Sequence, residues 1–229
     1  MSKIKGEGGY KFIAPITRLL FKLYYHPKIY NKKVIPKKGP IIIVCNHKHI
    51  MDQCMTICAT KRPIHYLAKK EYFDGHFAWF FKLGGCISVD RQNGAHDATE
   101  KAINFLNQGS AVGLFPEGTR NRTTDTKLLP LKFGAVSMAK KTGATIVPCC
   151  VTGDYKFRSK NLVVKYGKPF QVSDDLEAAN EYLAETILGL MDECLEMTNR
   201  TWEEELNSHF HDKKQQQEKK EVKEEDKNE

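Results

Sequence analysis

The sequence predicts an α/β fold, a single domain with a largely parallel or mixed sheet flanked by helices and preceded by an amphipathic helix. Short apolar runs rich in Ile and Val alternate with helical patterns along residues 39–210, which is typical of strands joined by helices. At 229 residues and 41% hydrophobic composition, the chain is long enough for one core and short for two. A basic amphipathic stretch precedes the alternation.

The amphipathic stretch covers about residues 11–24. On a helical wheel, seven apolar side chains share one arc: Phe12, Ile13, Ile16, Leu19, Leu20, Leu23 and Tyr24. Lys11, Arg18 and Lys22 lie together on the opposite side. Because proline is tolerated in the first turn of a helix and breaks its interior, Pro15 predicts that regular helix begins near Ala14.

The positive charge of the chain is concentrated in this region. The formal net charge is +8, and residues 1–40 contain ten Lys or Arg against one acid, while the later residues are nearly balanced. A basic helix with a wide apolar face, and no nucleic-acid-binding motif, predicts docking on an anionic membrane surface. A helix that only covers the domain core is the alternative. A second membrane contact is predicted at Phe77, Trp79, Phe80 and Phe81, with core packing as an equal alternative.

The hydropathy pattern predicts that the chain lies on a membrane and does not cross it. No segment has the roughly 18 uncharged apolar residues of a spanning helix, and the N-terminus lacks the pattern of a signal peptide. The seven cysteines lie mostly in apolar segments without paired zinc spacing, which indicates reduced core residues in a cytosolic compartment. We therefore expect a peripheral or monotopic protein on the cytoplasmic face of a membrane.

The remaining elements follow in order. Strands are predicted at residues 41–45, 64–68, 86–89, 111–115, 145–151 and 162–166. Helices are predicted at about 51–60, 97–107, 131–141 and 176–206. The chain thus divides into a basic membrane-docking segment, 1–38, a folded domain, 39–210, and a charged tail, 211–229, that is expected to be disordered.

Polar residues follow several predicted strands directly. His47, Arg91 and the run from Pro116 to Arg120 each come just after an apolar strand. Since the carboxyl ends of parallel strands meet at one edge of a sheet, we expect these residues to converge there.

His47 and Asp52 are the first candidates for chemistry. In one continuous helix, five positions would leave the two side chains about 140° apart, on different faces. If His47 lies in the turn after the strand and Asp52 in the first turn of the next helix, the carboxylate can accept a hydrogen bond from the imidazole. The other ring nitrogen is then available as a general base. A loop histidine beside a carboxylate at a helix N-terminus is the alternative interpretation.

Four ordered blocks carry a resemblance to a known family. They are Asn46-His47-Lys48-His49-Ile50-Met51-Asp52, Gly85-Cys86-Ile87-Ser88-Val89-Asp90-Arg91, Phe115-Pro116-Glu117-Gly118-Thr119-Arg120 and Ile146-Val147-Pro148. Together they resemble the glycerophospholipid acyltransferases, most closely the 1-acyl-sn-glycerol-3-phosphate acyltransferases. The resemblance spans about residues 39–151.

The resemblance implies transfer of a fatty acyl chain from acyl-CoA or acyl-carrier protein to the sn-2 hydroxyl of lysophosphatidate, giving phosphatidic acid without a cofactor or metal. His47, oriented by Asp52, would be the general base. No acyl-enzyme is required, and no Gly-x-Ser-x-Gly motif is present. Lys69 resembles a lysine near the family's active site and is a candidate to stabilise the oxyanion.

The resemblance also assigns the acceptor site. Arg91 and Arg120 occupy the arginine positions of the second and third blocks and would bind the acceptor phosphate, for which the guanidinium is the usual match. Glu117, Gly118 and Thr119 complete the third block, which in the family is associated with acceptor binding. Gly118 would permit close approach of the backbone, and Thr119 offers a hydroxyl.

One departure opens other possibilities. The family commonly has serine where this chain has His49, so His47, His49 and Asp52 are also a possible metal site of a hydrolase. The nearest enzymatic alternatives are a lysophospholipid acyltransferase and a glycerol-3-phosphate acyltransferase. A membrane-binding protein without catalysis is a further class, disfavoured by intact His47, Asp52 and Glu117.

Overall fold

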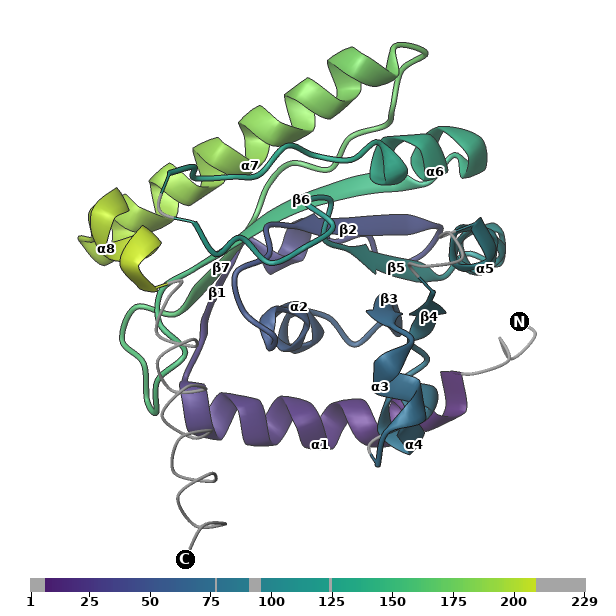
Figure 1. The fold of residues 1–229 in the computed structure, drawn as a ribbon, viewed down its shortest axis with the longest axis horizontal. Helices are drawn as coiled ribbons and strands as arrows, with labels where there is room; N and C mark the ends of the chain where they lie inside the picture. The colour runs from purple at the N-terminus through teal and green to yellow at the C-terminus, as the bar shows by residue number, and fades with distance from the viewer. Residues whose placement is uncertain (1–6, 77, 91–95, 124, 209–229) are drawn as a thin grey trace, which may run out of the picture.

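The computed structural model contains one seven-stranded sheet and describes residues 7–76, 78–90, 96–123 and 125–208. The strands lie in the order β1-β7-β6-β2-β5-β3-β4 (Figure 1). Their bounds are β1 Lys28–Tyr30, β2 Ile41–Cys45, β3 Ile64–Lys69, β4 Ile87–Val89, β5 Ala111–Leu114, β6 Thr145–Thr152 and β7 Val163–Tyr166. All neighbours are parallel except β6 and β7, so the mixed sheet predicted from the sequence is confirmed.

The central strand β2 explains why the sheet forms here. All five of its residues are buried, as expected for a strand of a parallel sheet covered on both faces. Val44 is in register with Leu114 of β5 and Pro148 of β6. The loops that follow β2 and β5 therefore leave the same edge of the sheet, side by side.

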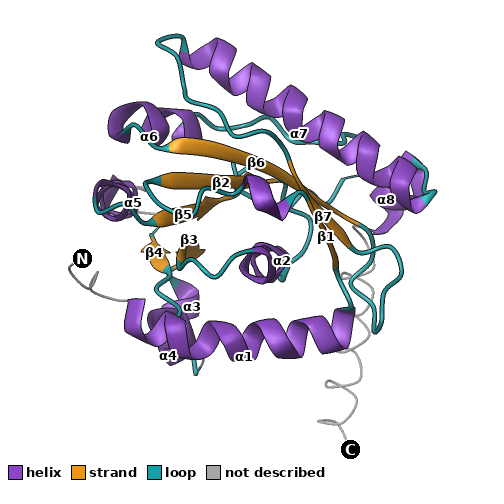
Figure 2. Ribbon diagram, turned by 180° about the vertical axis from the view of Figure 1, so that it is seen from behind, coloured by secondary structure: helices purple, strands orange, loops and turns teal. Residues whose placement is uncertain are grey.

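Helices cover both faces of the sheet (Figure 2). On one face lie α5 His96–Asn107, α6 Gly134–Thr142 and α7 Leu176–Thr198, which pack into one hydrophobic cluster with β2 and β6. On the other face lie α1 Glu7–Tyr25, α2 Asp52–Ala59, α3 Glu71–Asp74 and α4 Ala78–Leu83. A short 3₁₀ turn, η1 Lys32–Val34, follows β1, and α8 Trp202–Ser208 follows α7.

The N-terminal helix differs from the prediction at its start. It begins at Glu7, and Pro15 lies inside it, so the predicted beginning near Ala14 is wrong. Tertiary packing holds the turns before the proline, because Tyr10 is buried and α1 packs on α2 and α4. A Cβ at Gly9 would lie 2.7 Å from the carbonyl oxygen of Leu83, so only glycine permits this approach of α1 to α4.

The last predicted helix is in fact two helices. α7 ends at Thr198 because Asn199, with a φ of 51°, adopts the left-handed conformation that closes helix C-termini. A capping box then starts α8. The N–H of Thr201 donates to Glu204 Oε2 at 2.8 Å, and the N–H of Glu204 donates to Thr201 Oγ1 at 3.2 Å.

Four short elements were not predicted: β1, η1, α3 and α4. They contain three, three, four and six residues, too few to show a period in the sequence. No helix of the described residues is both long and apolar enough to span a bilayer.

Candidate active site

The predicted hydrogen bond between His47 and Asp52 is present. The loop after β2 brings His47 Nδ1 within 2.8 Å of Asp52 Oδ2, and Asp52 is the first residue of α2. The backbone N–H groups of Lys48 and His49 also donate to Asp52 Oδ2, each at 2.8 Å. Asp52 thus fixes the loop between β2 and α2 by accepting hydrogen bonds from its backbone, as carboxylates near helix N-termini commonly do.

Asp52 is ionised at neutral pH. The side chain is fully buried, and burial alone would raise its pKa. Hydrogen bonds from His47, from Tyr155 and from the backbone of His49 outweigh burial, so the pKa of Asp52 lies below its usual value. An ionised Asp52 can only accept a hydrogen bond, so Nδ1 of His47 carries the proton and the lone pair lies on Nε2.

The imidazole of His47 is fixed on its face as well as at its edge. It stacks on Phe115, the residue after β5, with ring centroids 4.0 Å apart and an angle of 13° between the planes. The side chain of His47 remains 19% exposed. A ring held in this way can present Nε2 to a substrate without rotating.

Glu117 holds the backbone of the same histidine. Its Oε1 accepts the N–H of His47 at 2.6 Å, and its Oε2 accepts the N–H of Leu129 at 3.0 Å. Glu117 is only 4% exposed, and burial raises its pKa to about 7. The structure thus gives Glu117 a supporting contact that sequence reasoning did not find, while its predicted binding of the acceptor stays a prediction.

Gly118 adopts a conformation that requires glycine. Its φ is +70°, and a Cβ would lie 2.8 Å from the ammonium of Lys132. The backbone at Gly118 thus approaches the side chain of Lys132.

Two cavities open on His47. The first, of about 340 Å³, is lined by His47, Lys69, Thr119, Arg120 and Arg122 among others. The predicted residues Lys69, Thr119 and Arg120 are therefore brought together with the histidine. Arg122 was missed, although it lies two positions beyond the third block.

The second cavity has a different lining. Its volume is about 390 Å³, and it shares His47, Lys69 and Phe115 with the first cavity. Its other cation is Lys132, and much of its wall is apolar, including Leu67, Leu114 and Met138. The two cavities thus meet at the imidazole, and one is richer in arginine than the other.

A small apolar cavity of about 60 Å³ lies between α1, α2 and α4. It shares Gln53, Tyr66, Phe81 and Cys86 with the wall of the first cavity. The first cavity and the small apolar cavity beneath α1 are therefore neighbours that have these four residues in common.

Two predicted residues lie outside the described part of the chain. Arg91 of the second block and Phe77 of the aromatic cluster are not among the residues that the structure describes. Elsewhere in the aromatic cluster, Trp79 is 57% exposed and Phe80 37%.

The three residues of the alternative metal site do not converge on one point. His47 Nδ1 meets Asp52, and His49 Nδ1 accepts the N–H of Met51 at 3.1 Å. The ring of His49 stacks on Tyr155 with centroids 4.0 Å apart. In the described ranges, no group of three or more His, Cys, Asp or Glu could hold a metal ion. That the protein needs no cofactor stays a prediction.

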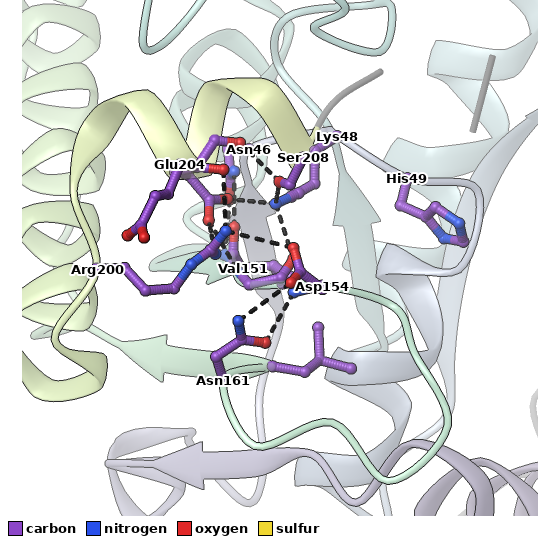
Figure 3. Close-up of polar contacts among 12 residues, drawn as sticks. Asn46, Lys48, His49, Val151, Asp154, Asn161, Arg200, Glu204 and Ser208 are labelled. Carbon is purple, nitrogen blue, oxygen red and sulfur yellow. Dashed lines mark hydrogen bonds and ion pairs between the residues drawn. The ribbon is translucent and has the colours of Figure 1, made fainter. Parts of the chain in front are cut away.

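A buried ionic network lies behind the loop of His47 (Figure 3). Lys48 is 6% exposed, and its ammonium binds the carboxylate of Glu205 in α8. It also donates to the carbonyl of Gly153 at 2.9 Å and to Ser208 Oγ at 2.8 Å. Arg200 completes the network by pairing with Glu205 and, at 3.3 Å, with Asp154.

Fold and site together define an α/β enzyme domain in which a histidine, hydrogen-bonded to a buried carboxylate, lines two neighbouring cavities. The chain belongs to the Acyltransferase family, because the family model of that name matches residues 26–152. The matched segment contains all four blocks and both members of the His47–Asp52 pair.

Individual relatives agree with this membership. The chain is 32% identical over 172 residues to the 1-acyl-sn-glycerol-3-phosphate acyltransferase of Bacillus subtilis, covering 72% of this chain and 84% of the relative. It is 37% identical over 136 residues to the enzyme of the same name from Borreliella burgdorferi, covering 58% of this chain and 54% of that protein. The chain thus spans most of one relative and about half of the other.

A solved structure has the same fold. The crystal structure of the 1-acyl-sn-glycerophosphate acyltransferase PlsC from Thermotoga maritima matches with a TM-score of 0.67 and 22% sequence identity. The match covers 84% of this chain and 83% of that one.

Proposed function

We propose that the protein transfers a fatty acyl chain from a thioester donor, acyl-CoA or acyl-carrier protein, to the sn-2 hydroxyl of 1-acylglycerol-3-phosphate, giving phosphatidic acid. The observation that carries the proposal is the 2.8 Å hydrogen bond from His47 Nδ1 to Asp52, at the meeting point of two cavities. Membership of the Acyltransferase family and similarity to relatives named for this reaction support the choice of substrates.

The reaction begins at His47 Nε2. This nitrogen takes the proton of the acceptor hydroxyl as the oxygen attacks the thioester carbonyl. Asp52 stabilises the imidazolium that forms, because its own charge is held by four hydrogen-bond donors. The tetrahedral intermediate then expels the thiolate of the donor. The thiolate takes from His47 the proton that came from the acceptor hydroxyl. The acyl group passes directly to the acceptor, so no residue of the protein is acylated.

Lys69 is the candidate to stabilise the oxyanion. It is the last residue of β3 and lines both cavities next to His47. A cation at the point where both substrates meet would lower the energy of the negative oxygen of the intermediate.

The acceptor phosphate is assigned to the first cavity. Arg120, Arg122 and the hydroxyl of Thr119 line it together, and paired guanidinium groups match phosphate oxygens in geometry and charge. Arg91 belongs to the same proposal through its place in the second block. The second cavity, which contains fewer cations and more apolar surface, is left for the thioester donor.

Membrane docking is assigned to the outer face of α1. Tyr10, Ala14 and Phe21 are buried against the domain, whereas Phe12 is 74% exposed, Leu20 61% and Leu23 60%. The helix therefore covers the core with one face and leaves a broad apolar face outward, which disfavours the alternative of a helix that only covers the core. Arg18, by contrast, lies inward and caps α2 through the carbonyls of Ile57 and Thr60 at 3.0 and 2.8 Å.

Two further features support membrane docking through the outer face of α1. Residues 1–40 are strongly basic, and the neighbouring helix α4 has exposed aromatic residues. The helices α1 and α4 lie side by side in both views (Figures 1 and 2). We infer that this surface lies on an anionic bilayer at the cytoplasmic face, as a peripheral or monotopic contact.

A parallel substrate assay tests the function. Purified protein is incubated with acyl-CoA and, separately, with lysophosphatidate, glycerol-3-phosphate and lysolipids of neutral headgroup. Phosphatidic acid as the main product supports the proposal. Preference for glycerol-3-phosphate or for a neutral lysolipid would replace it with one of the two alternative acyltransferases. If the enzyme loses its activity in excess chelator and regains it when a metal is added, the alternative of a metal-dependent hydrolase would be favoured instead.

A further inference from the structure

The second oxygen of the Asp52 carboxylate has a partner of its own, a side chain that the sequence did not single out. The phenol of Tyr155 donates to Asp52 Oδ1 at 2.6 Å, while His47 and two backbone N–H groups share Oδ2. Tyr155 lies 103 positions away along the chain, in the loop after β6. Burial raises the pKa of Tyr155 well above its usual value, so the phenol stays protonated and remains a donor at neutral pH.

The ring of Tyr155 contacts two other aromatic rings. His49 stacks on one face, with centroids 4.0 Å apart and planes 14° apart. Tyr25, from the end of α1, makes an edge contact at 5.6 Å and 83°. A tyrosine fixed by these two contacts presents its hydroxyl in one place.

The loop that carries Tyr155 is anchored at both ends. On the side of α8, the N–H of Gly153 donates to Glu205 at 2.9 Å, and Asp154 pairs with Arg200 (Figure 3). On the side of α1, the N–H groups of Arg158 and Ser159 donate to the carbonyls of Tyr24 and Tyr25 at 2.7 and 3.1 Å.

Gly153 makes this path possible. Its φ is +91°, and a Cβ there would lie 2.0 Å from the carbonyl oxygen of Asn161, so another side chain would displace the loop. Two helices that are far apart in the sequence thus fix the position of one phenol.

We propose that Tyr155 is a positioning residue for the His47–Asp52 pair. A carboxylate can rotate about its last bond at low cost. By holding Oδ1, Tyr155 prevents that rotation and keeps Oδ2 aimed at Nδ1 of His47. Loss of the Tyr155 hydroxyl would also leave Oδ1 of the buried Asp52 without a hydrogen-bond donor, which would weaken the hydrogen bond between Asp52 and His47. The inference rests on the proposed role of His47 as the base.

The test removes only the hydroxyl, in Tyr155→Phe. We expect kcat to fall about 10- to 100-fold, because orientation of a base is worth about that much. The KM values for lysophosphatidate and for acyl-CoA should stay within about twofold, because the ring and the cavity walls remain. The matched control is Tyr166→Phe, because the hydroxyl of Tyr166 is buried and, within the described residues, has no hydrogen-bond partner.

A spectroscopic measurement distinguishes positioning from a loss of folding. The Nδ1 proton of His47, identified by its absence in His47→Gln, should shift in the proton NMR spectrum of Y155F and not in that of Y166F. A thermal midpoint within a few degrees of the parent would accompany it. Y155F with a normal kcat, or with an unchanged Nδ1 signal, overturns the proposal.

The base assignment is tested separately. His47→Ala that keeps near-normal turnover refutes the proposed function itself. His47→Ala without turnover, together with normal Y155F, refutes only the role of Tyr155.

Discussion

The substitution Glu117→Gln tests how burial controls the site. In the folded protein the pKa of Glu117 is raised from 4.5 to about 7, mainly by burial. The folded state therefore binds a proton between about pH 4.5 and 7 that the unfolded chain releases, so the stability contributed by this group falls as pH rises through that window. One pH unit of difference in pKa corresponds to about 1.4 kcal/mol, so we expect a loss of about 2–3 kcal/mol between pH 5 and pH 8.

The variant Glu117→Gln cannot titrate and should not show this loss. The measurement is the free energy of unfolding in urea at pH 5 and pH 8, for the parent and the variant. The free energy of unfolding of the variant, relative to that of the parent, should rise by about 2–3 kcal/mol from pH 5 to pH 8. Glu185→Gln, at an exposed position of α7, is the matched control and should leave the difference unchanged. A difference for Glu117→Gln that is constant with pH, or that changes in the opposite sense, would refute the reasoning.

Three other variants test other parts of the protein. Arg120→Ala should raise the KM for lysophosphatidate about 10- to 100-fold with little change in the donor's KM, and equal changes for both substrates would remove Arg120 from the phosphate site. Leu19→Ser with Leu20→Ser and Leu23→Ser should reduce sedimentation with anionic vesicles and leave the thermal midpoint intact; this is a cleaner test than deletion of α1, because deletion would uncover the core beneath Phe21. Lys48→Met should destabilise the fold by about 2–4 kcal/mol in urea, because Glu205 then keeps only Arg200 as a cation; a loss below about 0.5 kcal/mol would show that the network is dispensable.

The sequence predicted the parts of the fold that rest on local patterns. Alternating apolar runs were sufficient for the parallel core, and the position of His47 just after one such run predicted its place at the strand edge. The hydrogen bond to Asp52 was predicted only on the condition that His47 lies in the turn before the next helix and Asp52 in its first turn, and the structure has that arrangement.

Contacts between distant segments were beyond sequence reasoning. Glu117 reaches the N–H of His47 across 70 positions, and Lys48 reaches Glu205 across 157. A buried lysine looks like any surface lysine in a sequence without an alignment. The inward position of Arg18 was missed for the same reason, since its partners are carbonyls at the end of α2.

The replacement of serine by His49 has a local explanation. A serine hydroxyl two positions before a backbone N–H can accept its hydrogen bond and close the turn. His49 Nδ1 makes this same contact with the N–H of Met51, at 3.1 Å. The larger ring then stacks on Tyr155 as well, which a serine could not do. The departure from the family pattern thus keeps the turn and adds a contact to the residue that holds Asp52.

The pKa values of the two buried carboxylates beside His47 are shifted in opposite directions, and the two groups differ in the number of hydrogen-bond donors that each receives. Asp52 accepts from the imidazole, two backbone N–H groups and a phenol, and its pKa is lowered despite burial. Glu117 accepts from two backbone N–H groups, lies near the negative charge of Asp52, and has a pKa raised to about 7. At neutral pH Asp52, which contacts the ring, therefore carries more negative charge than Glu117, which contacts the backbone. Environments that separate the pKa values of neighbouring acids are how enzymes assign different tasks to them. In the proposed mechanism the acid with the lowered pKa, Asp52, would support the imidazolium, while Glu117 holds the backbone of the loop.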